Sequence, residues 1–313
     1  MFRPAGVYAA MMTPFDRQRR VDVPVLRNLV DFLVEAGVNG LFPCSSSGEF
    51  ARLTDEERRL VIETVLDQAG GRVPVTPGVG GPGVDQAIIY AREALSLGSD
   101  GVVLCPPYYY HNLPQESVMR HFQMVADAVA GPIIIYNIPA YCCPITPDSV
   151  GVLCREYTHI VAIKDSSCNM VTFGHLLDLT AEARDDFSVL TGAEEMLYPS
   201  LVMGGRGGML ISANVVPEPL VEIVRCANSG EHCRARHLQR SLLKLTRAME
   251  AVPFPAGYKL GLEARGFPAG GDRHPMGPEG ERLRGASRPL VRELVWQVLD
   301  EAGLEPTHRG GRR

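Results

Sequence analysis

The sequence predicts an α/β protein: a closed (β/α)8 barrel, or TIM barrel, with a helical extension at its C-terminal end. Short apolar segments alternate with amphipathic helical patterns, eight times between residues 6 and 230. These segments are apolar nearly throughout, which is typical of parallel strands covered by helices on both faces. After residue 230 the pattern is helical only. A barrel of this kind fits a chain of 313 residues.

Each expected strand is followed by an expected helix. The strands are expected within residues 6–15, 37–47, 72–80, 98–107, 131–139, 159–167, 187–195 and 205–214, and the helices within 23–36, 54–69, 83–98, 114–129, 146–157, 170–183, 194–204 and 217–230. Thr54 and Glu57 form a capping-box pattern. Pro147 follows Thr146 as a proline in a first turn. Glycines are expected to end several helices, at Gly37, Gly70, Gly98 and Gly230.

An open, doubly wound sheet is the alternative fold, but the glycine pattern GxGxxG is missing after the first strand. The glycine-rich stretch 78–83 follows the third strand, and we interpret it as a turn. We expect the barrel to span residues 1–230 and to carry the active site. A helical extension is expected at 231–304, with helices within 231–251, 254–267 and 287–304 and a loop at 266–281. Residues 305–313 are expected to form a disordered basic tail.

The composition, 45% hydrophobic and 21% charged, is that of a soluble globular protein. A net charge of −5 gives no indication of nucleic-acid binding. No apolar run is long enough to span a membrane, and the N-terminus does not resemble a signal peptide, so we expect a cytoplasmic protein. The eight cysteines show no CxxC pair or zinc spacing, so we expect structural thiols and no metal site; the adjacent Cys142 and Cys143, in a loop, fit this interpretation least well.

Lys164 has an unusual position in the stretch HIVAIKDSSC, residues 159–168. It occupies the end of an expected buried strand, and active sites of such barrels lie at the C-terminal ends of their strands. Only three of the 31 basic residues are lysines, and the other two, Lys244 and Lys259, lie in helical patterns. The remaining strand ends offer mostly hydroxyl groups, within residues 44–49, 106–111, 136–139, 191–195 and 211–214.

A lysine surrounded by hydroxyl groups suggests Schiff-base chemistry. Burial lowers the pKa of a lysine, and the neutral amine can attack a carbonyl carbon. A tyrosine hydroxyl can transfer the proton of an aldol oxygen, and a tight serine-rich turn can hold a carboxylate. No histidine–carboxylate set for a metal and no Ser-His-Asp triad is readable. Together, the strand-end lysine, the tyrosine and the serine-rich turn predict a class I aldolase that acts on an α-keto acid without a cofactor.

Each residue also has a structural interpretation. Lys164 could extend to solvent or pair with Asp165, and Tyr136 could be a packing residue. The segment SSSGE occurs in generic turns, and an acidic pair after a strand is common at a helix start. The catalytic interpretation is favoured because several of these features fall on barrel strand ends in one chain.

At these residues the chain resembles the dihydrodipicolinate synthase / N-acetylneuraminate lyase family of pyruvate-dependent aldolases. The resemblance covers nearly the whole chain and includes the motifs SSSGEF, PPYYY, YNIP, IKDSS and GGMLISANVVPE, in that order. It implies that Lys164 forms the Schiff base with pyruvate and that Tyr136 transfers protons. It further implies that Ser46 and Ser47 hold the pyruvate carboxylate and relay protons.

The resemblance also implies that Tyr109 reaches across a dimer interface into the neighbouring site and that the protein is a homotetramer, a dimer of dimers. The catalytic set is thus Lys164, Tyr136, Tyr109 and Ser46. The substrate-binding positions that we expect are Ser46, Ser47, Gly48, Gly192, Glu194, Ile211 and Tyr141.

Departures from the family pattern concern the substrate. Ser45 stands where the family has glycine, and Ser47 where it has threonine. Tyr141 occupies the position of the arginine that binds the aspartate-semialdehyde carboxylate in dihydrodipicolinate synthases. Glu194 and Glu195 match an acidic pair that binds sugar hydroxyls in N-acetylneuraminate lyases, but Ile211 replaces a hydroxyl-bearing residue of those lyases. The segment GEFARLTDEER, residues 48–58, resembles the sugar-acid and hydroxy-oxoglutarate aldolases of the family more than its synthases or N-acetylneuraminate lyases.

The function that we predict is cleavage of a 2-keto-3-deoxy sugar acid or a 4-hydroxy-2-keto acid to pyruvate and an aldehyde. The enzyme alternatives are dihydrodipicolinate synthase, which condenses pyruvate with aspartate semialdehyde, and a dehydratase or hydratase-aldolase of the same family. An alternative from another class is a non-catalytic protein that binds keto acids. Neither a nucleic-acid nor a membrane partner is expected.

Overall fold

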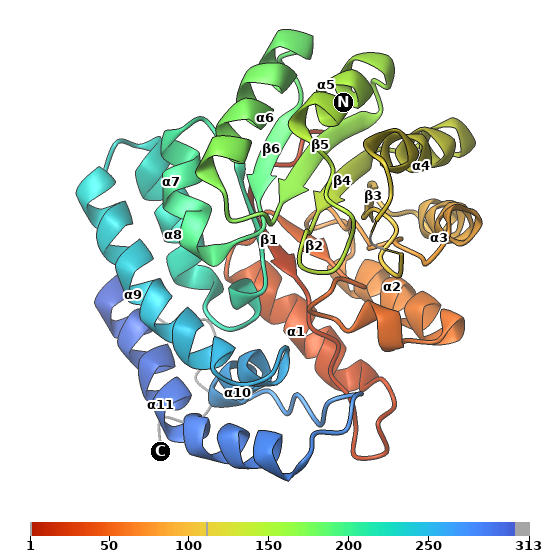
Figure 1. Cartoon of the computed structure of the whole chain (residues 1–313). Coiled ribbons are helices and arrows are strands. Elements are labelled where there is room, and N and C mark those ends of the chain that lie inside the picture. Colours follow the sequence, from red (N-terminus) through yellow and green to blue (C-terminus); the bar gives the residue numbers. More distant parts are fainter. Residues whose placement is uncertain (1, 111, 304–313) are drawn as a thin grey trace.

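A computed structural model describes residues 2–110 and 112–303, in which helices surround a ring of parallel strands (Figure 1). The strands are β1 (Gly6–Ala10), β2 (Gly40–Phe42), β3 (Val102–Leu104), β4 (Ile133–Asn137), β5 (Ile160–Asp165), β6 (Ser188–Thr191) and β7 (Gly207–Leu210). The barrel helices are α1 (Val23–Glu35), α2 (Asp55–Ala69), α3 (Val84–Ser96), α4 (Gln115–Ala128), α5 (Pro147–Glu156), α6 (Met170–Ala183), α7 (Leu197–Val202) and α8 (Pro217–Asn228). This architecture confirms the predicted TIM barrel.

The third expected strand is not a regular strand, so the described residues contain seven strands rather than eight. The sheet order is β2-β1-β7-β6-β5-β4-β3, with all pairs parallel. Residues 74–79 fill the gap between β2 and β3 through isolated parallel bridges, Leu41 with Val75 and Gly78 with Val103. Two prolines in this segment, Pro74 and Pro77, lack the N–H groups that a continuous ladder needs. The segment still closes the barrel.

The predicted helix signals are confirmed at both ends of the helices. The Thr54 side chain accepts from the Glu57 N–H while the Glu57 carboxylate accepts from the Thr54 N–H, which starts α2. The Thr146 hydroxyl likewise caps α5. All four glycines expected after helices adopt positive φ, the conformation that ends a helix.

Three helices follow the barrel: α9 (His232–Glu250), α10 (Ala256–Ala264) and α11 (Pro278–Ala302). They pack on α8 and on each other along one side of the molecule (Figure 1). Arg265, at the end of α10, is fully buried and binds Glu218 of α8 through both guanidinium ends, at 2.7 and 3.1 Å. Burial of such a pair fixes the extension against the barrel.

The prediction of a loop through residue 281 is wrong, because α11 begins at Pro278. Its first turn has the proline and acidic residues that favour a helix start. The helical pattern is weak in the sequence because the first half of α11 contains Gly280, Gly285 and Pro289, all poor helix formers. The basic tail expected at 305–313 lies outside the described residues.

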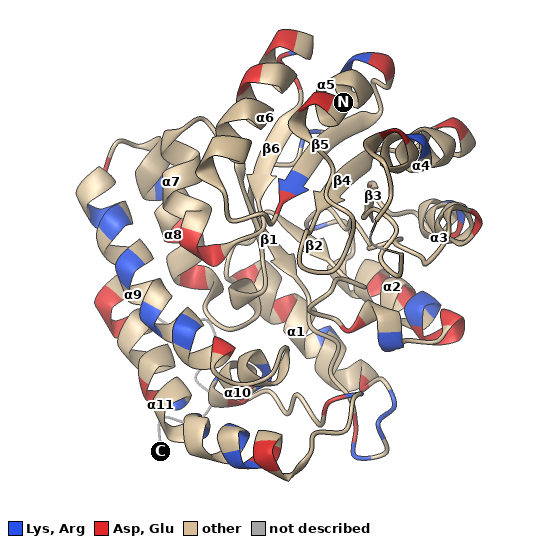
Figure 2. Cartoon of the chain, viewed as in Figure 1, with Lys and Arg blue, Asp and Glu red and all other residues tan. Residues whose placement is uncertain are grey.

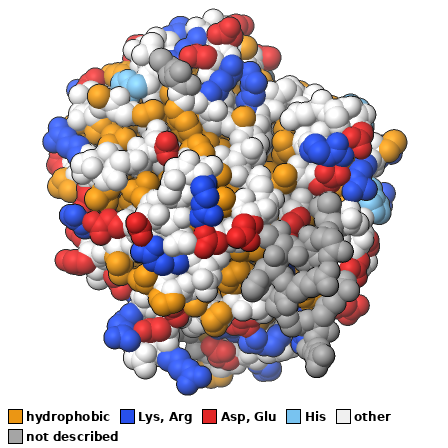
Figure 3. Space-filling view, turned by 180° about the vertical axis from the view of Figure 1, so that it is seen from behind, with side chains coloured by type: hydrophobic (Ala, Val, Ile, Leu, Met, Phe, Trp, Pro, Cys, Tyr) orange, Lys and Arg blue, Asp and Glu red, His pale blue; other side chains and the backbone are white. Residues whose placement is uncertain are grey.

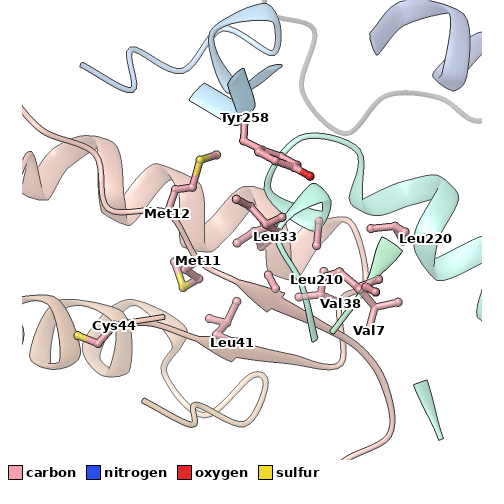
Figure 4. Close-up of a cluster of buried hydrophobic side chains, with 14 of the residues drawn as sticks. Val7, Met11, Met12, Leu33, Val38, Leu41, Cys44, Leu210, Leu220 and Tyr258 are labelled. Atoms are coloured by element: carbon pink, nitrogen blue, oxygen red, sulfur yellow. The ribbon is translucent and has the colours of Figure 1, made fainter. Parts of the chain in front are cut away.

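The main apolar core lies between the strands and the helices around them. Figure 4 shows part of it, where Val7, Leu41 and Leu210 come from three neighbouring strands. Leu33 and Leu220 contribute from helices, and Tyr258 of α10 joins the same cluster. A second, smaller cluster of side chains lies inside the barrel; it contains Tyr8, Phe42, Val103, Ile134, Tyr136, Ala162, Leu190 and Met209.

Charged residues lie mostly on the outer helices (Figure 2), and side chains of both signs are interspersed on the face that Figure 3 shows. The end of β5 is an exception, because Figure 2 shows a basic residue there and Lys164 is the only basic residue of that strand. Among residues 2–110 and 112–303, no helix is both long enough and apolar enough to cross a membrane.

Candidate active site

Lys164 lies at the C-terminal end of β5, where the barrel buries it. Its register partners are Tyr136 on β4 and Leu190 on β6. Only 3% of the residue is exposed. Burial lowers the pKa of the Lys164 amine to about 7, and the Glu194 carboxylate offsets part of this effect through space. About half of the amine is therefore neutral at pH 7.

Aromatic rings, rather than a carboxylate, surround the Lys164 amine. The nitrogen Nζ lies 4.1 Å from the centre of the Tyr136 ring and 5.1 Å from that of Phe42. No carboxylate of the described residues lies within ion-pair distance of Nζ. Ring faces attract a cation more weakly than a carboxylate does, so the amine is held in place without being fixed in its charged form.

Asp165, which the sequence offered as an ion-pair partner of Lys164, has other partners. Its side chain is fully buried and accepts from the Asn137 amide at 2.7 Å and from the Ser167 hydroxyl at 2.7 Å. Successive side chains of a strand point to opposite faces, so Asp165 and Lys164 face apart. The carboxylate of Asp165 anchors the turn after β5.

The Tyr136 hydroxyl is buried near two serine hydroxyls. Burial raises the pKa of Tyr136 well above its usual value, and the hydroxyls of Ser46 and Ser166 offset part of this increase. The phenol is therefore protonated at neutral pH. Ser46 is half-buried, and it links the Tyr136 hydroxyl to the loop after β2.

The loop of residues 44–49, which we call the serine loop, is held tightly against the end of β1. The Ser45 hydroxyl donates to the Met11 carbonyl at 3.0 Å and accepts from the Gly48 N–H at 3.2 Å. The Thr13 hydroxyl donates to the Gly48 carbonyl at 2.8 Å. A Cβ on Gly48 would meet the Met11 carbonyl oxygen at 2.8 Å, so this position requires glycine. The Ser45 hydroxyl therefore anchors the serine loop.

Glu194 lies deep in the site, at the start of the 3-10 helix η2 (Glu194–Met196). Burial raises the pKa of its carboxyl, and the hydrogen bonds from Ser212 counter this. The Ser212 N–H and hydroxyl both donate to the same Glu194 oxygen at 3.0 Å. Ile211 is buried beside Ser212, without a hydroxyl of its own. Glu194 thus has a second oxygen that none of these bonds uses.

Gly192 makes room for the lysine. A Cβ at this position would lie 2.0 Å from the Ser166 hydroxyl oxygen and 2.5 Å from the Lys164 Cε. Real Cβ atoms do not approach this closely, so only glycine leaves Lys164 in its observed position.

A cavity of about 310 Å³ opens beside the serine loop. Ser46 and Glu49 line one side, and Tyr141, Cys142 and Arg52 are also in its wall. Cys142 and Cys143 are buried free thiols, as are all but two of the eight cysteines. Tyr141 is half exposed at the cavity edge and carries no positive charge.

Tyr109 does not reach the site of its own chain. It is 70% exposed, and its ring packs against that of the equally exposed Tyr110 at 5.0 Å. The structure therefore brings together Lys164, Tyr136, Ser46, Gly192 and Glu194, but leaves Tyr109 outside.

Several residues near the site were not singled out from the sequence. Phe42 and Ser166 lie beside Lys164 and Tyr136. Tyr258 of α10 and Glu250 of α9 lie near Glu194 and Glu195, since these carboxylates raise the pKa of Tyr258 further, after burial itself. Glu250 and Tyr258 come from helices that the sequence assigned to a separate extension, so no local signal marked them. In the described part of the chain, no group of three or more His, Cys, Asp or Glu residues is arranged to bind a metal.

A buried amine with a lowered pKa at the end of a barrel strand, beside a tyrosine, has the chemistry of class I aldolases, which form a Schiff base through lysine. The comparisons with known proteins agree with that class. The model of the dihydrodipicolinate synthetase family matches residues 3–293, and the chain belongs to this family of Schiff-base-forming lyases.

Relatives and solved structures match over nearly their whole length. A 4-hydroxy-tetrahydrodipicolinate synthase of Methanopyrus kandleri is 35% identical over 97% of this chain and 98% of its own. A DapA-like lyase of Pyrococcus horikoshii, described as uncharacterized, is 35% identical over 84% of this chain and 91% of its own. The YagE protein of E. coli K12, solved in complex with pyruvate, has a TM-score of 0.86 at 29% identity, over 93% of this chain and 98% of its own.

The space at Gly192 gives a testable prediction. Gly192→Ala should displace the Lys164 side chain and lower the rate of Schiff-base formation by roughly 100-fold, because misplacement of a reacting group by about 1 Å has effects of that size. The rate can be followed by reductive trapping of a keto acid.

Gly83→Ala is the matched control, since a Cβ there meets nothing within 4 Å. This variant should trap the keto acid at the wild-type rate. Equal rates for Gly192→Ala and Gly83→Ala would show that Gly192 does not position the lysine.

Proposed function

We propose that this protein is a pyruvate-forming lyase that cleaves a 2-keto-3-deoxy sugar acid. The observation that carries the proposal is the buried Lys164 amine, with a pKa of about 7 and its Nζ 4.1 Å from the Tyr136 ring. A neutral amine in this position can attack the keto carbon of the substrate, and the resulting carbinolamine takes up a proton and loses water to form an iminium.

The iminium then accepts the electrons of the C3–C4 bond. In the proposed cleavage, Tyr136 takes the proton of the C4 hydroxyl as that bond breaks, and passes its own proton toward Ser46. An aldehyde leaves, and the extra proton held by Tyr136 and Ser46 returns to C3 of the enamine. Hydrolysis of the resulting iminium releases pyruvate and regenerates Lys164. The proposed role of Ser46, Ser47 and Gly48 is to hold the substrate carboxylate in the serine loop.

The charges around the rest of the site favour a hydroxylated substrate over a dicarboxylate. Glu195 lies close enough to Glu194 to raise its pKa further, after burial, and both carboxylates raise the pKa of Glu250 in the same way. Carboxylates accept hydrogen bonds from sugar hydroxyls and repel a second carboxylate. In the described cavity lining, the only basic residue is Arg52, which is bound to Glu49 at 2.8 Å.

Exposure of Tyr109 supports a proposal about assembly. We infer that the protein acts as a homotetramer in the cytoplasm, in which Tyr109 completes the site of a neighbouring subunit. An aromatic side chain that is 70% exposed, beside a second one, is more typical of an interface than of a solvated surface.

Reductive trapping tests the proposed chemistry. Incubation with pyruvate and borohydride should give a protein whose mass is increased by that of pyruvic acid less one oxygen atom, with the adduct on Lys164. Lys164→Ala should give no adduct, and neither should Lys164→Arg, because a guanidinium remains protonated.

Lys244→Ala is the matched control, because Lys244 is exposed on α9. It should trap pyruvate as the wild type does. An adduct that persists in Lys164→Ala would refute the assignment of the lysine, and the absence of any adduct in the wild type would favour a non-catalytic binding protein.

A second candidate function is 4-hydroxy-tetrahydrodipicolinate synthase, the name carried by the Methanopyrus kandleri relative. Its second substrate, aspartate semialdehyde, has a carboxylate, and the neutral Tyr141 stands where the resemblance places an arginine. We therefore expect kcat/KM for a 2-keto-3-deoxy sugar acid to exceed that for the condensation by at least about 100-fold. A site without a cation leaves the second carboxylate unpaired, and an unpaired polar group of this kind strongly lowers kcat/KM.

A panel of keto acids assayed for pyruvate release, beside a coupled assay with pyruvate and aspartate semialdehyde, measures this ratio. Tyr141→Arg should raise turnover of aspartate semialdehyde by supplying the missing cation. Faster condensation than cleavage in the wild type would establish the second candidate instead.

A further inference from the structure

Lys259 is a second buried lysine, and the proposed chemistry does not use it. It belongs to α10, in the part of the chain that follows the barrel, and only 1% of it is exposed. Burial of an ammonium group is costly unless its donors are paired. Lys259 therefore needs partners for its charge inside the protein.

The Lys259 ammonium donates two hydrogen bonds, to Glu49 and to the Gly271 carbonyl, and makes an ion-pair contact with Asp272. Nζ lies 2.7 Å from a Glu49 carboxylate oxygen, 3.0 Å from the Gly271 carbonyl and 3.3 Å from an Asp272 carboxylate oxygen. The nitrogen also lies 4.9 Å from the centre of the Phe15 ring. Lys259 thus joins α10, the segment before α11 and the serine loop.

Glu49 uses its second oxygen as well. That oxygen accepts from the Arg52 guanidinium at 2.8 Å and from the Arg273 N–H at 3.2 Å. Burial alone raises the pKa of the Glu49 carboxyl, but Lys259 and Arg52 outweigh burial and hold the pKa below its usual range. The carboxylate is therefore charged and fully bonded at neutral pH.

The backbone at Glu49 explains why such an anchor is needed. Glu49 and Cys44, at the two ends of the serine loop, both have positive φ, of 57° and 51°, which non-glycine residues avoid. Such a conformation persists only where surrounding contacts impose it. The Glu49 N–H donates to the Ser46 carbonyl at 3.1 Å, so the position of Glu49 sets that of Ser46.

We propose that Lys259, through its ion pair with Glu49, is a positioning residue that shapes the serine loop to receive the carboxylate of the keto acid. The inference rests on the proposed function, because it assigns that carboxylate to the loop. Apart from burial, the charge that acts on the Lys164 amine is that of Glu194 and not that of Lys259.

The test compares pyruvate affinity with reactivity. Lys259→Met should raise the pyruvate concentration that gives half-maximal borohydride trapping by about 10-fold to 100-fold, because loss of the anchor releases the loop. The trapping rate at saturating pyruvate, expressed per trappable site, should stay within about twofold of the wild type because the surroundings of Lys164 are unchanged.

Two further variants make the result decisive. Glu49→Gln removes the ion pair with little change of volume, and should raise the half-saturating concentration too, even where Lys259→Met does not fold. Lys244→Met, the same substitution on the exposed face of α9, should change nothing.

A role in stability alone would reduce the number of trappable sites and leave the half-saturating concentration unchanged, which would overturn the proposal. Failure of the wild type to trap pyruvate at all would instead overturn the proposed function. The two failures are thus distinguishable.

Discussion

Removal of the Lys164 amine from water is the constraint on which the rest of the site depends. A lysine with its ordinary pKa of 10.5 would be neutral in roughly three molecules in ten thousand at pH 7. The lowered pKa corresponds to a penalty on the charged form on the order of 5 kcal/mol. The barrel provides this penalty because the end of β5 is enclosed by neighbouring strands and their side chains.

The surroundings of Lys164 preserve that effect. Gly192 leaves room for the lysine stem, and the rings of Phe42 and Tyr136 lie where a carboxylate would otherwise restore the charge. Lys259 provides the contrast, since its ammonium is equally buried but bonded to Glu49 and near Asp272. One fold therefore contains a buried lysine suited to nucleophilic chemistry and another suited to an ion pair, and the difference lies in their partners.

The sequence predicted the barrel and the lysine because both depend on local patterns. The eight-fold alternation and the position of Lys164 at a strand end are visible in the residues themselves. The irregular closing segment at 74–79 and the early start of α11 were missed, because prolines and glycines weaken the local signal. The sequence also contained no signal for the place of Tyr258 near the site or for the Lys259–Glu49 ion pair. Glu49 and Lys259, for example, lie some 200 positions apart along the chain.

The pH dependence of Schiff-base formation tests the central claim most directly. Attack requires the neutral amine, so the trapping rate at saturating pyruvate should rise with pH and reach half its maximum near the Lys164 pKa of about 7. A rate that remains low through neutral pH and rises only near the ordinary lysine pKa of 10.5 would contradict the account.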